Sequence, residues 1–217
     1  MPPPDMAASM HSMGLSLALV IFALAVALAL RPWRALRADG VLQPWLACLV
    51  LLPWVWAAQR VMPGGVSVQL SGACLLVLMV GWPLAVLSLL PIAAIGAWLG
   101  GIAWPQALDH LAWNGMVAAT LALFIGLATR RWLPHHPFVF ILGRGFIVTA
   151  LAMMAAGTMS AYVQPPPEST ELGSVLLGHW LMAWGEAFST GMLVAIFVAF
   201  KPEWLATWSD ARYLPKD

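Results

Sequence analysis

Charged side chains inside long apolar segments are the residues of this chain that could do chemistry. His179 and Glu186 lie seven residues apart in one such segment, so an α-helix would place both on one face. Arg144 lies in another, between two glycines. A charge at the centre of a membrane helix costs about 2.5–3.5 kcal/mol to insert and therefore indicates a specific role. The sequence predicts either an Arg144–Glu186 ion pair joining two helices, or a ligand-binding or proton-relay role for Glu186.

Two further polar groups are candidates for binding. Asp109 and His110 open an apolar segment, and Asn114 follows one turn later. We interpret Asp109 as a helix cap, because an acidic group there satisfies free N–H groups and suits the helix dipole. A buried Asn114 amide would need polar partners. Near the N-terminus, His11 stands among methionines, and imidazole with thioether ligands suits Ni(II), Co(II) or Cu(I).

The elements that position these residues are predicted to be membrane helices. Of the 217 residues, 62% are hydrophobic and 9% are charged, against about 25% charged in soluble domains. This composition excludes a disordered chain and argues against a soluble globule. A net charge of +1 argues against a nucleic-acid partner. Cys48 and Cys74 lie in apolar runs and are interpreted as small hydrophobic residues, not as a disulfide or metal pair.

The chain is therefore expected to be an all-α, polytopic transmembrane bundle in the lipid bilayer of the inner (plasma) membrane. A short N-terminal segment, residues 1–13, precedes a helical domain, 14–200, and a cytoplasmic tail, 201–217. Pro91 is expected to turn the chain between the third and fourth spans. Basic residues gather in alternate loops, which predicts an N-out, C-in orientation. The seven predicted spans lie at about 14–30, 41–58, 68–90, 91–103, 111–128, 138–159 and 175–200.

No enzyme is predicted, because the chain shows neither a nucleophile–base pair at recognisable spacing nor a nucleotide-binding loop. Uphill transport would draw on an ion gradient or on a partner. In the first span, Ala23 and Ala27 are four residues apart, as are Ala25 and Ala29. Small residues at this spacing allow close helix approach, so Ala23 and Ala27 are candidates for docking a membrane partner.

Several stretches resemble the CbiM/NikM family. Residues 63–73, PGGVSVQLSGA, are similar to the family's PGGTSVHLLGA, and residues 179–191, HWLMAWGEAFSTG, to its HxLIGIGEALITG with the same gap from His to Glu. Residues 201–205, KPEWL, resemble the family's closing RPDLL. Residues 114–116, Asn-Gly-Met, resemble the family's Asn-Met-Gly more weakly. The blocks keep the family's order from about Met62 to Leu205.

The resemblance implies the substrate-capturing membrane component of an energy-coupling-factor importer for cobalt or nickel. Its expected partners are a membrane coupling subunit and cytoplasmic ATPase subunits, which would hydrolyse ATP. The metal ion would be the transported substrate, and no bound cofactor is expected. In the family, the terminal amine, an amide nitrogen and the imidazole of the second residue bind the metal with the SVH histidine.

This sequence departs from that ligand set. Gln69 replaces the SVH histidine, and the chain begins Met1-Pro2-Pro3-Pro4, in which proline offers no amide N–H. A start at Met10 would restore a Met-His terminus. The resulting candidate metal ligands are His11, Gln69, Asn114 and His179.

Two interpretations remain open. In one, a divergent importer component still carries a transition metal with changed ligands. In the other, the same fold carries a different small solute, or serves as a membrane scaffold or assembly protein without transport.

Overall fold

The structure is a computed structural model that describes residues 4–33, 40–58, 60–61, 67–134, 136–164, 171–209 and 213. The proline-rich start and part of the family-like stretch, residues 1–3 and 62–66, lie outside this set. The described chain forms helices and one antiparallel hairpin, β1 (Arg60–Val61) with β2 (Ser67–Val68). The α-helices are α1 (Pro4–Ala29), α2 (Leu42–Ala57), α3 (Ala73–Val80), α4 (Trp82–Gly100), α5 (Trp104–His110), α6 (Ala118–Trp132), α7 (Val148–Val163) and α8 (Leu172–Phe200). The π-helical segments are η2 (Leu111–Val117) and η3 (Val139–Ile147), and a 3-10 turn, η4 (Pro202–Trp204), follows α8.

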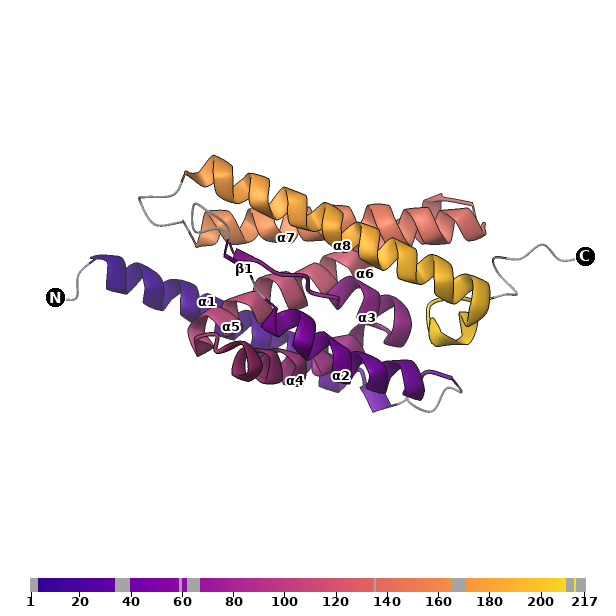
Figure 1. Cartoon of the computed structure of the whole chain (residues 1–217), viewed down its shortest axis with the longest axis horizontal. Coiled ribbons are helices and arrows are strands. Elements are labelled where there is room, and N and C mark those ends of the chain that lie inside the picture. Colours follow the sequence, from indigo (N-terminus) through magenta and orange to yellow (C-terminus); the bar gives the residue numbers. More distant parts are fainter. Residues whose placement is uncertain are drawn as a thin grey trace, which may run out of the picture.

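The predicted membrane bundle is confirmed. Five helical stretches in the described chain are long and apolar enough to cross a bilayer: residues 11–29, α4, the continuous stretch 104–132, the stretch 139–163, and α8. Helix α2 is apolar but shorter. In Figure 1, α7 and α8 run together along one side of the bundle, while α3 and α6 lie towards its middle. The start of α1 and the end of α8 lie at opposite ends of the bundle (Figure 1), and the N-out orientation stays a prediction.

The boundary between the third and fourth spans differs from the prediction. Pro91 lies inside α4 and does not turn the chain. The turn is at Gly81, whose φ of +80° is readily adopted only by glycine. Helix α3 has eight residues, a length of about 12 Å, which cannot cross a bilayer alone. The predicted third span is therefore not a continuous helix: it comprises the hairpin strand β2, a non-helical stretch at 69–72, and α3.

A short helix buried at both ends needs partners for its free backbone groups. At the C-terminal end of α3, the carbonyl oxygens come into contact with the segment after α8. The Ala206 N–H donates to Met79 O at 3.0 Å, and Thr207 Oγ1 donates to Leu78 O at 2.9 Å. The first part of the predicted tail thus packs on the bundle, and the partner at the other end of α3 belongs to the candidate site.

Candidate functional site

Glu186 binds the backbone at the start of α3. The Ser71 N–H donates to Glu186 Oε2 at 2.8 Å, and the Gly72 N–H donates to Oε1 at 2.5 Å. The Glu186 side chain is 2% exposed. A carboxylate here satisfies N–H groups that have no partner within the helix and lies at the positive end of the helix dipole. Helix α8 therefore caps α3 through a residue 115 positions away in sequence.

Gln69 lies two residues before this cap and is 7% exposed. Its Nε2 donates to the carbonyl oxygen of Trp56 at 3.0 Å, and the Trp56 indole N–H donates to Ser71 O at 2.8 Å. These bonds fix the amide against the end of α2. The Gln69 Oε1 atom is buried without a hydrogen-bond partner. A buried acceptor without a donor costs free energy, so this oxygen is a candidate ligand atom.

Asn114, on the helical stretch 104–132, binds the same non-helical stretch. Its carbonyl oxygen accepts a hydrogen bond from Ser71 Oγ at 2.7 Å. Its side-chain Nδ2 lies 3.3 Å from His110 Nδ1, one helical turn away. Asn114 belongs to the π-helical segment η2, and such segments occur often at functional sites. The structure thus places Asn114 between the Gln69 stretch and a histidine that the sequence reasoning did not include among the ligands.

His179 is positioned by a glycine of the neighbouring helix. A Cβ built on Gly157 of α7 would lie 2.8 Å from His179 Cβ and Cγ and 2.9 Å from Nδ1. Only glycine therefore lets the imidazole lie this close to the α7 backbone. His179 also lies within electrostatic range of His110. The signal that could have singled out His110 was its spacing of four from Asn114, which puts both on one helical face.

Asp109 is not a helix cap in this structure. It lies near the end of α5, not at a helix start, because residues 104–132 form one continuous helix. Its Oδ1 accepts a hydrogen bond from Ser16 Oγ at 2.6 Å, and Gln164 Nε2 donates to the same Ser16 oxygen at 3.3 Å. The Ser16 hydroxyl of α1 thus links Asp109 of α5 to Gln164, the residue that follows α7.

The fourth predicted ligand, His11, is exposed on α1. It precedes Ser16 by five residues on a continuous helix, a rise of about 7.5 Å. Helix α1 extends back to Pro4, which lies about 18 Å along the axis from Ser16. Within the described chain, no three His, Cys, Asp or Glu side chains are grouped as a metal site. Of the predicted ligands, Gln69 lies two residues from Ser71, whose hydroxyl binds the Asn114 carbonyl. His179 interacts electrostatically with His110, and His11 is exposed on α1.

The predicted Arg144–Glu186 ion pair is wrong. Both oxygens of Glu186 bind backbone N–H groups of Ser71 and Gly72, not Arg144. The Arg144 guanidinium carbon lies 5.3 Å from the Phe140 ring centroid, a cation–π contact. It also lies beside Gly126 of α6.

The predicted docking pair also requires correction. Ala23 is 8% exposed and Ala27 is 0% exposed, because α1 packs that face on α4 and η2 of its own chain. The pair cannot present a surface to a partner in this structure. Ala25 and Ala29, at the same spacing, are exposed. The two cysteines are both free and buried.

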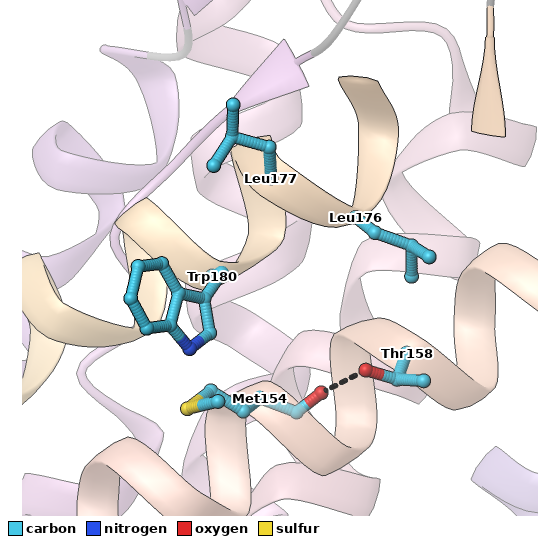
Figure 2. Close-up of a pocket in the computed structure, with 5 residues that line it drawn as sticks. All are labelled: Met154, Thr158, Leu176, Leu177 and Trp180. Atoms are coloured by element: carbon cyan, nitrogen blue, oxygen red, sulfur yellow. Dashed lines mark hydrogen bonds between the residues drawn. The ribbon is translucent and has the colours of Figure 1, made fainter. Parts of the chain in front are cut away.

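Two further grooves among the described residues are lined mostly by apolar side chains. A groove of about 370 Å³ lies between α7 and α8. Figure 2 shows the side chains that line it, among them Trp180 and Leu177. The side-chain oxygen that lines it, on Thr158, already donates to Met154 O at 2.7 Å. A groove of about 570 Å³ between α1 and the η2–α6 helix is almost entirely apolar.

Comparison with known proteins identifies a family. The sequence profile of a family described as "Cobalt uptake substrate-specific transmembrane region" (CbiM) matches residues 6–204, which is most of the chain. No curated protein and no solved structure matches it.

Proposed function

Because this chain belongs to the CbiM family of cobalt-uptake substrate-specific transmembrane proteins, we propose that it binds a cobalt or nickel ion as the membrane component of an energy-coupling-factor importer. The observation that carries the proposal is the buried Gln69 Oε1 atom without a donor. It lies on the stretch that resembles the family's SVH motif. A cation bound there would supply the missing partner.

The other ligands follow from what surrounds that oxygen. The Asn114 amide nitrogen is engaged by His110, which leaves the Asn114 amide oxygen for a cation. His179, held against Gly157, supplies an imidazole, and His11 would join from α1. Imidazole nitrogens combined with amide oxygens suit borderline divalent ions such as Co(II) and Ni(II). Gln69, Asn114, His179 and His11 are the proposed ligand set, with His110 beside them.

The proposed mechanism assigns capture to this chain and energy to its partners. The chain carries no nucleotide-binding loop, so ATP hydrolysis is assigned to separate cytoplasmic subunits, coupled through a membrane subunit. The exposed Ala25 and Ala29 face of α1 offers small residues for close helix approach to that subunit.

Metal titration of the purified chain tests the proposal. Isothermal calorimetry with Co(II), Ni(II) and Zn(II) is run on two forms, one starting at Met1 and one at Met10. The second form places the terminal amine next to His11. Stoichiometric Co(II) or Ni(II) binding that Gln69→Leu abolishes supports the importer role. If neither form binds any of these ions, the proposal fails, and another solute or a scaffold role becomes the better account.

A further inference from the structure

Glu186 is a buried acidic residue that caps the start of α3. Its two oxygens accept from Ser71 N–H and Gly72 N–H, at 2.8 and 2.5 Å. With both oxygens bound to the backbone and the side chain 2% exposed, Glu186 is not placed to ligate a metal directly. Its effect on a bound ion must pass through the residues that it holds.

The stretch that Glu186 holds is the one that carries Gln69. This stretch is non-helical, so no ladder of helical hydrogen bonds fixes it. Tertiary contacts fix it instead. The Trp56 carbonyl and indole hold Gln69 and Ser71 from α2, the Asn114 carbonyl holds the Ser71 hydroxyl from η2, and Glu186 holds two successive N–H groups from α8. Only the Glu186 contact is charge-assisted, and such bonds are about twice as strong as neutral ones.

We propose that Glu186 is the positioning residue of the metal site: its carboxylate fixes the 69–72 stretch so that Gln69 Oε1 faces the ion. The inference rests on the proposed function. It assigns to α8 a role that differs from that of the His179 imidazole on the same helix. Gly72 adopts φ +66° at the junction, a conformation that glycine reaches freely, so the backbone itself does not select the direction of this stretch. Loss of the Glu186 cap is therefore expected to move Gln69 while the bundle stays folded.

Glu186→Gln tests the role. The glutamine side chain offers one acceptor oxygen to two N–H groups, and its own NH₂ group opposes the second. The Co(II) Kd, measured by calorimetry on the full chain, is expected to rise at least about tenfold, equal to about 1.4 kcal/mol. The visible absorption band of bound Co(II) should also shift, because the Gln69 oxygen changes position. A merely structural residue would move neither readout in the protein that remains folded.

Ser88→Ala is the matched control. Ser88 is also 2% exposed, and it joins α2 to α4 by accepting from the Trp45 indole at 2.7 Å. Its loss should lower the unfolding temperature without changing the Co(II) Kd or spectrum. If the Glu186→Gln protein cannot be purified in folded form, Glu186→Asp is used in its place. Aspartate keeps the charge and both oxygens but is one methylene shorter, so a smaller rise in Kd with a shifted spectrum is expected.

The outcomes separate the two proposals. Wild-type protein that binds no Co(II) overturns the proposed function and this inference together. If the wild-type protein binds Co(II) and the folded Glu186 variant shows the same Kd and spectrum, only the positioning role is overturned.

Discussion

Gly157→Ala is the substitution that tests most directly how α7 positions His179. The new methyl group would lie 2.8 Å from His179 Cβ and Cγ and 2.9 Å from Nδ1. Carbon atoms in ordinary contact are about 3.5–4.0 Å apart, so the imidazole or the helix must move by about 0.7–1.2 Å. The Cβ and Cγ atoms lie at the base of the side chain, so a rotation about its outer bonds cannot relieve the clash.

The magnitude comes from two opposing terms. Overpacking of this kind costs about 1–3 kcal/mol. Replacing glycine by alanine inside a helix raises the free energy of unfolding by up to about 1 kcal/mol, because alanine has the higher helix propensity. With the full offset, the net expectation is a loss of up to about 2 kcal/mol in the free energy of unfolding. The displacement of His179 should in addition weaken Co(II) binding.

The assay is reversible unfolding in mixed micelles, with Co(II) calorimetry on the same samples. Gly14→Ala is the control, because a Cβ on Gly14 of α1 would meet no atom within 4 Å. That variant should keep or raise stability, by at most about 1 kcal/mol. If Gly157→Ala were as stable as Gly14→Ala, the close packing of His179 against α7 would be refuted.

Three further predictions follow from burial and backbone geometry. Ala27→Leu should lower the free energy of unfolding by about 1–3 kcal/mol through overpacking, whereas Ala25→Leu, on the exposed face, should leave it unchanged in micelles; equal unfolding curves would place α1 in the wrong rotation. Gly72→Ala should destabilise the chain by about 1–3 kcal/mol, since φ is +66° and its Cβ would lie 2.5 Å from Leu52 Cδ2; thermal melts without a shift would argue against this backbone. Gln69→Leu should abolish Co(II) binding in calorimetry while the chain still folds, and an unchanged Kd would remove Gln69 from the ligand set.

The sequence alone was enough to predict the class of fold and the family. Long apolar segments require helices in a bilayer, because no water is available there for unpaired backbone groups. The family-like stretches, with His179 and Glu186 seven residues apart, are local patterns, and the match over residues 6–204 confirms the family they indicated. Gln69 was recognised as a departure by its place in such a pattern.

The partners of polar groups were decided only in the tertiary structure. Opposite charges made Arg144 and Glu186 the obvious pair, yet Glu186 binds the backbone of Ser71 and Gly72. The sequence offers no sign of this contact, because every residue has a backbone N–H except proline. The contact exists because α3 begins inside the bundle, at a point set by Gly72 and not by an apolar boundary.

The sequence likewise did not show which face of α1 is buried. Ala23 and Ala27 have the same spacing as Ala25 and Ala29, but the first pair is buried and the second exposed. In a soluble helix, polar residues mark the outer face. In a membrane both lipid and core are apolar, so the sequence of α1 carries no such mark, and only packing against α4 and η2 decides which side is inside.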